Sequence, residues 1–375
     1  PTIAEELADV LYTRGRFDEA IDYYQQALSG KDISAEALYR LGASLLQLNR
    51  SDEALNHLEA AFKKDPTHAE ARLLYGRLLN RAARYPEAEE VLRNPNAPSE
   101  ADEDYKLELA VSLLEQGKLE AAEETTRQLL NNDSQDSRAL TLLGEIYLKR
   151  KQYEAARREL IRALRLNPKE SRAQLALGRT WLAIGKTRGD RNDLNKARQI
   201  LADAVGVHEG ERLLTLGQIS LAEGETETAI NLIERSISEE ANPLFSRLAL
   251  AEARYENEDL PGAAAELQRA SALAPFDPAL SLSIALVYAQ LDDAVRASEE
   301  YLKAIQGIGM SAPASEGTGP VVLPHPYIPL PERFNINRSI RNAHRQALSG
   351  NEEDATALAL KTLAESASFV IAGTN

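Results

Sequence analysis

The chain lacks cysteine altogether and has one methionine and one tryptophan among its 375 residues. Without cysteine there is no disulfide, no thiolate nucleophile, no CxxC zinc site and no covalent haem attachment. No apolar run approaches the roughly 18 residues that a membrane-crossing helix needs. Excess positive charge is also missing, because 43 Lys and Arg face 58 Asp and Glu and the formal net charge is -15. That balance argues against general nucleic-acid binding, which depends on neutralising phosphates.

Catalytic and metal-binding motifs are absent as well. There is no GxSxG, no GxxxxGK[ST], and no GxGxxG following a strand. The histidines show no HxxxH or HExxH spacing and no nearby carboxylate cluster with metal-ligand spacing. They are His57, His68, His208, His325 and His344. We therefore predict a protein that is not an enzyme, with no metal and no cofactor.

The composition constrains the compartment weakly. At Pro1 the chain shows no charged segment followed by an apolar one, so no secretory leader is visible, and a leader that has already been removed stays open as the alternative. An absence of cysteine suits an oxidising compartment and slightly favours an extracytoplasmic location. An acidic cytoplasmic protein has the same composition, so both locations stay open.

What the chain does contain is a period of 34 residues. In residues 4–28, two apolar-periodic stretches are separated by Gly15, and Leu7, Ala8 and Leu11 share one face of the first. That spacing is typical of an amphipathic helix. The same pattern returns 34 residues later and survives, with local irregularities, to about residue 310.

Two small residues mark each copy, one on each helix. The first small position reads Ala8, Gly42, Gly76, Ala110, Gly144, Gly178, Gly217, Ala251 and Ala285. The second reads Ala20, Ala54, Ala88, Ala122, Ala156, Ala197, Ala229, Ala263 and Ala297, twelve residues later in every copy but the sixth. This pattern resembles the tetratricopeptide repeat, in which the small residues of the two helices nest together. A larger side chain at the second position would force the helices apart, at a cost of about 1–3 kcal/mol.

The resemblance implies an all-α, right-handed superhelical solenoid of about nine repeats over residues 3–310. We expect irregularities at 94–101, where Asn94-Pro95 ends a helix early, and at 185–196. In the sixth copy seven extra residues separate Gly178 from Ala197, which predicts a longer internal turn. Residues 311–334 are rich in Pro and Gly and are expected to be extended. Residues 335–372 are expected to form a helical hairpin, a degenerate tenth repeat or cap.

In this family the first helices line a concave groove, so the resemblance implies a partner-binding surface there. A leucine ladder with isolated charges is expected to line it from the third repeat onward. A solvent-facing apolar stripe would indicate a partner, and the open alternative is that adjacent helices bury the leucines. The expected groove residues are Tyr39, Leu73, Arg77, Leu107, Val111, Glu145, Leu175, Arg179, Leu214, Gln218, Leu248, Glu252, Leu282 and Leu286.

One subset of the family grips an acidic peptide C-terminus with Lys and Asn at groove positions. This chain has Glu5, Asp9, Tyr39 and Ala43 there. The resemblance therefore disfavours a co-chaperone that binds chaperone tails.

Charge is unevenly distributed along the chain. Residues 138–200 carry a balance of +10, whereas residues 209–310 carry -11. A basic band can steer an acidic partner or orient copies head to tail, and the alternative is a solvated helix face. The band is expected at Arg157, Arg158, Arg162 and Arg165.

The Pro-rich segment offers a candidate occupant for the groove or for a neighbouring subunit, and the alternative is a flexible spacer. Its apolar residues, a possible docking segment, are Val321, Leu323, Tyr327, Ile328 and Leu330.

These features predict a non-catalytic scaffold that assembles or stabilises a larger protein complex through its groove and charged faces. The partners are expected to be other proteins, with self-association possible through the charge-asymmetric faces or the C-terminal segment. Two alternatives stay open: a regulatory subunit of an enzyme on another chain, and a peptide-binding receptor.

Overall fold

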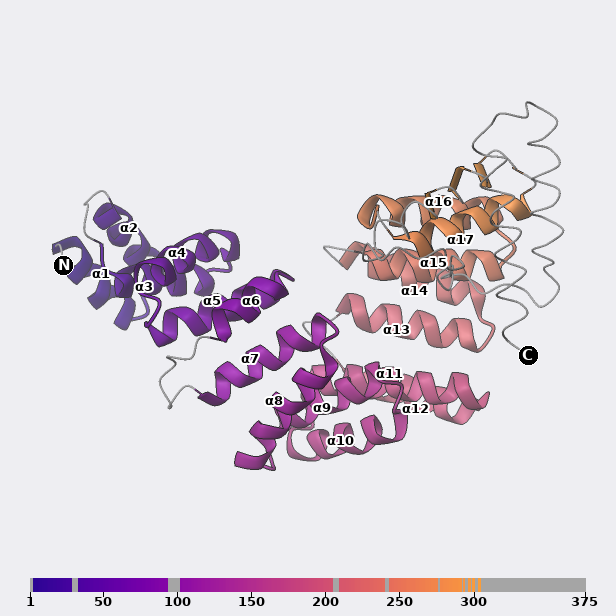
Figure 1. Ribbon diagram of the computed structural model, residues 1–375, viewed down its shortest axis with the longest axis horizontal. Helices are drawn as coiled ribbons and strands as arrows, with labels where there is room; N and C mark the ends of the chain where they lie inside the picture. Colours follow the sequence, from indigo (N-terminus) through magenta and orange to yellow (C-terminus); the bar gives the residue numbers. More distant parts are fainter. Residues whose placement is uncertain are drawn as a thin grey trace, which may run out of the picture. The chain divides into compact units, whose positions relative to one another are not determined.

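The computed structural model describes residues 3–28, 33–93, 102–204, 209–239 and 243–304, apart from positions 276, 292, 294, 295, 298, 301 and 302. The segment 311–334, with its proposed docking residues, and the hairpin 335–372 lie outside the described residues. Every regular element within the described ranges is an α-helix (Figure 1). The all-α prediction from the 34-residue period is therefore confirmed.

The helices follow one another as consecutive pairs. Those of the first five repeats are α1 (Ile3–Thr13), α2 (Phe17–Leu28), α3 (Ala35–Gln47), α4 (Ser51–Lys64), α5 (Ala69–Arg81), α6 (Tyr85–Leu92), α7 (Asp102–Glu115), α8 (Leu119–Asn132), α9 (Ser137–Lys149) and α10 (Tyr153–Leu166). The others are α11 (Ser171–Arg188), α12 (Arg191–Asp203), α13 (Glu209–Ala222), α14 (Thr226–Glu239), α15 (Leu244–Glu256), α16 (Leu260–Leu273) and α17 (Pro278–Gln290).

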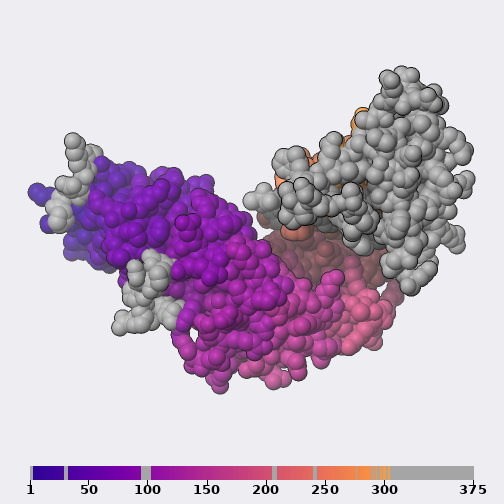
Figure 2. Space-filling view, viewed as in Figure 1, coloured from indigo at the N-terminus to yellow at the C-terminus, as the bar shows by residue number. Residues whose placement is uncertain are grey.

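Two compact units divide the chain, Pro1–Thr180 and Trp181–Asn375. In the first, α1 packs on α2, α3 on α4, and so on to α9 on α10; in the second, α13 packs on α14 and α15 on α16. Within each unit, side chains close the spaces between neighbouring helices (Figure 2). The fold is an all-α repeat solenoid of helical hairpins, and a single continuous array over residues 3–310 stays a prediction.

A residue with a left-handed backbone lies in the turn between the two helices of each hairpin. Its φ is 71° at Gly15 and 74° at Gly117, but also 56° at Ala83, 60° at Lys151 and 62° at Glu258. The left-handed region costs a residue with a side chain about 1–2 kcal/mol relative to glycine. The packing of the two helices therefore imposes this turn even where the local sequence disfavours it.

Close packing at the small positions holds each hairpin together. Every alanine of the second small position, from Ala20 to Ala297, has an exposed fraction of 0%. A Cβ placed on Gly42 would lie 2.7 Å from Cγ of Leu58 and 3.4 Å from the carbonyl oxygen of Ala54. The closest neighbour of the first small residue is thus a leucine one turn beyond the expected alanine. Glycine there makes room for that leucine.

Neighbouring hairpins share their apolar cores. In the first three repeats one cluster contains Tyr24, Leu41, Leu45, Leu58 and Leu79, and each of these side chains is 0% exposed. Because these side chains come from α2 to α5, each repeat supplies part of the core of the next. This arrangement explains why one hairpin alone would leave an apolar face uncovered.

The sixth repeat corrects the sequence prediction. The seven extra residues do not lengthen its turn, because α11 ends at Arg188 and α12 already begins at Arg191. Instead α11 has 18 residues, against 13 in α9. A Cβ on Gly185 would lie 2.7 Å from Cδ2 of Leu194, and Gly185 lies twelve residues before Ala197. The usual spacing is therefore kept from Gly185, two helical turns after Gly178.

The third repeat has a short second helix. Helix α6 has 8 residues and ends at Leu92, whereas α4 and α8 have 14. Pro95 follows closely in the sequence, and a proline there cannot continue a helix. Residues 94–101 themselves lie outside the described ranges.

Candidate protein-interaction face

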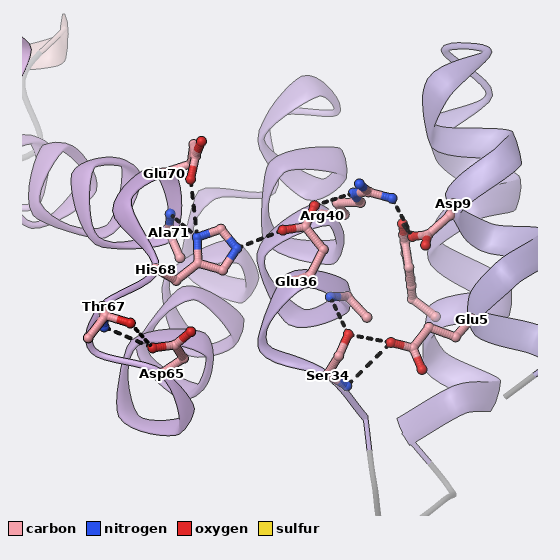
Figure 3. A network of polar contacts seen from close by, with 12 residues as sticks. Glu5, Asp9, Ser34, Glu36, Arg40, Asp65, Thr67, His68, Glu70 and Ala71 are labelled. Carbon is pink, nitrogen blue, oxygen red and sulfur yellow. Dashed lines mark hydrogen bonds and ion pairs between the residues drawn. The ribbon is translucent and has the colours of Figure 1, made fainter. Parts of the chain in front are cut away.

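The first helices of successive repeats contact one another, α1 with α3, α3 with α5, α5 with α7 and α7 with α9. We call the surface that they form the first-helix face. Figure 3 shows its polar contacts in the first three repeats. Asp9 and Arg40 are 2.9 Å apart, Arg40 lies 2.6 Å from Glu36, and Glu36 lies 2.7 Å from His68. One row of polar and charged side chains therefore joins α1, α3 and the start of α5.

Glu5 anchors the start of the second repeat. Its side chain is 3% exposed, and it accepts hydrogen bonds from the hydroxyl of Ser34 and, at 3.3 Å, from its backbone N–H (Figure 3). The Ser34 hydroxyl in turn accepts from the backbone N–H of Ala37 at 3.0 Å and caps α3. A side chain that accepts a hydrogen bond from a backbone N–H group in the first turn of a helix stabilises that helix by about 1 kcal/mol. At the position where a carboxylate clamp would carry a cation, this chain has a buried acid that fixes the next helix.

Ion pairs continue across the later steps of the first unit. The Glu145 carboxylate raises the pKa of the Arg172 guanidinium, which keeps that pair ionised. Each pair joins the first helices of consecutive repeats, so it opposes sliding of one hairpin against the next. The pairs are Arg77–Glu108 at 2.8 Å, Asp104–Arg138 at 3.1 Å, Glu115–Lys149 at 3.1 Å and Glu145–Arg172 at 2.8 Å.

The expected leucine ladder lies inside the protein. Tyr39 and Leu73 in the second and third repeats are half-buried. The later leucines contribute to helix packing, so burial by adjacent helices, the alternative that the sequence left open, describes them. Their exposed fractions are 8% for Leu107, 5% for Leu175, 6% for Leu214, 8% for Leu248 and 6% for Leu282.

The other expected groove residues follow the ladder residues by four positions on each first helix, and they reach solvent more often. Six residues of this column are half-buried, namely Arg77, Val111, Glu145, Arg179, Gln218 and Glu252. Leu286 is the exception, at 5% exposed. The solvent-reaching part of this column is thus mainly polar, and its assignment to partner binding stays a prediction.

Glu252 on α15 has an unusual environment within this column. Burial raises the pKa of its carboxyl group, Lys186 lowers it, and Glu256 raises it further. Among the described residues no salt bridge joins Glu252 to a cation. Desolvation without a close partner disfavours the charged form of a carboxyl group, so Glu252 is a polar group whose ionisation opposes folding.

The basic band lies on α10. Arg158, Arg162 and Arg165 are exposed and Arg157 is half-buried. Within the helix, Arg157 lies 2.7 Å from Glu154 and Arg162 lies 2.6 Å from Glu159. Acidic neighbours therefore offset part of the band, and Arg158 and Arg165 carry much of its outward charge.

Sequence reasoning missed Arg72 on α5. Its side chain is 0% exposed, and none of its three guanidinium nitrogens has a hydrogen-bond partner among the described residues. The available signal was its repeat position, since the corresponding residues Leu38 and Leu140 are apolar and buried. The inter-repeat ion pairs were missed as well; their signal was opposite charges about one repeat apart.

Groups that would bind a metal ion are not brought together in the described ranges, where no three His, Asp or Glu side chains are suitably placed. In the same part of the chain no helix is long and apolar enough to cross a membrane. The described polar groups instead bridge helices or reach solvent on the first-helix face and α10. Such an arrangement suits contact with another macromolecule.

Comparison with known families agrees with the repeat geometry. One tetratricopeptide repeat model matches residues 5–55, 39–101 and 248–313, and a second model of the same repeat matches residues 113–180. The chain belongs to the tetratricopeptide repeat family. It is a repeat protein of the class that serves as a protein-interaction scaffold, a class that is typically non-catalytic.

Several solved structures match this chain at low sequence identity. A tetratricopeptide repeat protein from Parabacteroides merdae is 17% identical, with 64% of this chain and 93% of that chain covered and a TM-score of 0.48. A thermophilic repeat protein of Thermus thermophilus is 24% identical over 53% of this chain and 99% of that one, with a TM-score of 0.45. Yeast Tom70 is 13% identical over 82% and 76%, with a TM-score of 0.43. A search of curated proteins gives no match.

Proposed function

We propose that this protein is a non-catalytic scaffold that assembles or stabilises a larger protein complex. The contact surfaces would be the first-helix face and the exposed arginines of α10. The observation that carries the proposal is the row of inter-repeat ion pairs, from Asp9–Arg40 to Glu145–Arg172. These pairs hold consecutive first helices in one arrangement before any partner arrives. A surface that is already ordered loses less conformational entropy on binding.

The chemistry of the surface also indicates the kind of partner. Half-buried Arg77 and Glu145 on the first-helix face carry opposite charges. A surface of mixed sign is complementary to a folded partner of mixed charge rather than to a uniformly acidic peptide tail, because like charges placed together oppose binding. Arg158 and Arg165 on α10 would add attraction to an acidic region of the same partner or of a second one.

Affinity purification of the chain from its source cells, followed by quantitative mass spectrometry, tests the proposal. We expect one or more proteins to be recovered in a fixed ratio to the chain. The double variant Arg158→Glu/Arg165→Glu is expected to lose a partner bound through α10, and Gln218→Arg one bound through the corresponding surface of α13 in the second unit. Lys64→Glu on α4, also exposed, is the matched charge-reversal control.

The outcomes separate the scaffold from its alternatives. A regulatory subunit would change the rate of a partner enzyme in proportion to occupancy. A peptide receptor would bind an isolated segment of the partner as tightly as the whole partner. Failure to recover any protein in a fixed ratio, with the helix content of the chain unchanged by circular dichroism, would contradict the scaffold.

A further inference from the structure

The outward side of α10 carries three arginines in line. Arg158, Arg162 and Arg165 are exposed and follow one another at i, i+4 and i+7, which places them on one face of the helix. The opposite face packs on α9, where Leu160 is buried beside Gly144. The three arginines therefore project from the surface of the first unit, and we call them the arginine row.

The helix does not need the arginine row in order to fold. A cation in the last turn of a helix interacts favourably with the helix dipole, and Arg165 lies in that turn of α10. Yet α8 and α14 have the same length as α10 and carry no basic residue in their last turn. The residues 34 positions earlier, on α8, are also exposed, and they are acidic or neutral: Glu124, Gln128 and Asn131.

Much of the positive charge of the row is left unpaired within the described structure. Arg162 lies 2.6 Å from Glu159, one turn earlier on the same helix. Arg158 and Arg165, in contrast, take part in no ion pair with another described residue. Exposed charges of one sign attract a partner of the opposite sign and orient it before contact. The row therefore suits an acidic ligand.

Acidic side chains beside the row indicate which acidic ligand fits. Glu154 lies one turn before Arg158 and is exposed, and Glu159 is half-buried next to Arg162. A phosphate backbone or an anionic membrane would bring negative charge against these carboxylates as well, and like charges placed together oppose binding. A protein can instead place single carboxylates against the arginines alone. The local charge pattern thus favours a protein segment over a continuous polyanion.

The shape of the site favours a helical segment. The backbone groups along the side of a helix are already hydrogen-bonded, so α10 cannot pair with an extended peptide as a sheet edge does. Side chains must make the contact, and a helix lying along α10 repeats its side chains at the same spacing. Half-buried Ile161 and Leu166, which is 45% exposed, flank the row on its two sides and offer apolar contact to such a helix.

We propose that the arginine row binds an acidic helix of the partner protein. The helix lies along α10, with carboxylates at i, i+3 or i+4, and i+7 facing the three arginines and an apolar side chain packed against Leu166. It would belong to the partner that the scaffold holds, so this inference rests on the proposed function and names the part of the partner that α10 recognises.

A synthetic helical peptide is the probe for this contact. It has about 18 residues, enough for an isolated helix rich in alanine, with Glu at i, i+3, i+4 and i+7 and one Leu beside them. Nuclear magnetic resonance of the labelled peptide, titrated with the whole chain, measures binding. We expect a dissociation constant on the order of 10⁻⁴ M at low salt, because exposed ion pairs are individually weak. Added salt should weaken binding.

Two controls separate a helical face from simple acidity and the row from net charge. A peptide of the same composition, with its Glu residues distributed around the helix, should bind at least about fivefold more weakly. Reversal of the row should raise the dissociation constant by roughly tenfold or more; the variant is Arg158→Glu/Arg162→Glu/Arg165→Glu. An equal change of net charge at exposed residues elsewhere in the first unit should have little effect; that variant is Arg14→Glu/Lys64→Glu/Arg81→Glu.

Charge exchange locates the contact on α10. A peptide with Lys in place of each Glu should bind the row-reversal variant and fail to bind the unchanged chain. Because this result is a gain of binding, it does not depend on a loss that misfolding could imitate, and circular dichroism verifies the helix content of both variants. A row-reversal variant that does not bind the lysine peptide would overturn the proposal.

Further outcomes would also overturn it. One is equal affinity for the two acidic peptides, which would show that a helical face is not recognised. Another is tighter binding, through the row, of a single-stranded oligonucleotide or of anionic lipid vesicles than of the acidic peptide. If affinity purification still recovers a partner in a fixed ratio to the chain in these cases, the scaffold stands and only the acidic helix is excluded.

Discussion

The guanidinium carbon of Arg72 lies 4.4 Å from the centre of the Tyr105 ring. Arg72 comes from α5 in the third repeat and Tyr105 from α7 in the fourth, and both side chains are buried. A cation over an aromatic face is stabilised by the ring quadrupole, by roughly 2 kcal/mol when desolvated. That attraction offsets only part of the cost of burying a guanidinium whose nitrogens lack hydrogen-bond partners in the described structure.

Replacing Arg72 with leucine should therefore stabilise the protein. Arg72→Leu restores the residue type found at Leu38 and Leu140, and we expect a gain of about 1–3 kcal/mol in the free energy of unfolding. Urea unfolding monitored by circular dichroism measures the change. A loss of stability would show that the guanidinium has a favourable partner.

The matched control is Arg247, at the same repeat position on α15. Arg247 lies 2.9 Å from Glu266, which is 1% exposed and also pairs with Arg269. Arg247→Leu removes one partner of a buried carboxylate, so it should destabilise the protein by about 3 kcal/mol. Opposite signs for the two arginine substitutions would show that pairing, and not burial alone, decides their effect.

The close packing around Gly144, the first small residue of the fifth repeat, predicts a steric effect when that residue is enlarged. A Cβ on Gly144 would lie 2.5 Å from Cγ of Leu160, so Gly144→Ala should destabilise the protein by about 1–3 kcal/mol. Alanine would otherwise favour a helix interior by about 1 kcal/mol. In the background Leu160→Thr, which imitates the Ala110–Thr126 pair of the fourth repeat, the loss should shrink or reverse. An equal loss in both backgrounds would contradict the contact.

The turns predict a backbone effect that is independent of packing. Ala83 has a φ of 56° and Gly117 a φ of 74° in corresponding turns. Ala83→Gly should stabilise the protein by about 1 kcal/mol, because glycine adopts this conformation without strain. Gly117→Ala should destabilise by a similar amount, although a Cβ there meets no atom within 4 Å. Thermal unfolding of the two variants measures both changes, and equal signs would contradict the explanation.

Because of the carboxyl group of Glu252, the stability of the folded protein should depend on pH. Burial raises the pKa of its carboxyl group in the folded protein, so the folded state binds its proton more tightly than the unfolded state does. The stability that this group contributes is full below its unfolded pKa of about 4.3 and is lost as pH rises through the folded pKa. Glu252→Gln should therefore raise the melting temperature at pH 7, and the gain should diminish toward pH 4.

The exposed neighbour Glu256 supplies the control for that measurement. Glu256→Gln removes one negative charge from the same helix without removing a buried carboxyl group. We expect a smaller change in melting temperature with little dependence on pH. If both variants behave alike, net charge rather than the burial of Glu252 is responsible.

The sequence by itself determined the repeat and the helical hairpin. The 34-residue period, the apolar spacing within each copy and the nine alanines at the second small position all describe which face of a helix turns inward. Ala20, Ala54 and Ala156 are 0% exposed, because a helix with one apolar face has few ways to bury it. For the same reason the 34-residue pattern alone carries the family resemblance.

Only the tertiary structure decided what covers each face. Leu107 and Leu248 looked like groove residues but are 8% exposed, while Leu166 on α10 remains uncovered at 45%. Periodicity cannot distinguish these leucines, because their exposure depends on a neighbouring helix that is distant in sequence. The extension of α11 and the burial of Arg72 against Tyr105 also depend on neighbouring helices. The spacing of apolar residues along one helix determines which face of that helix turns inward. Burial and charge pairing, in contrast, depend on several helices packed together.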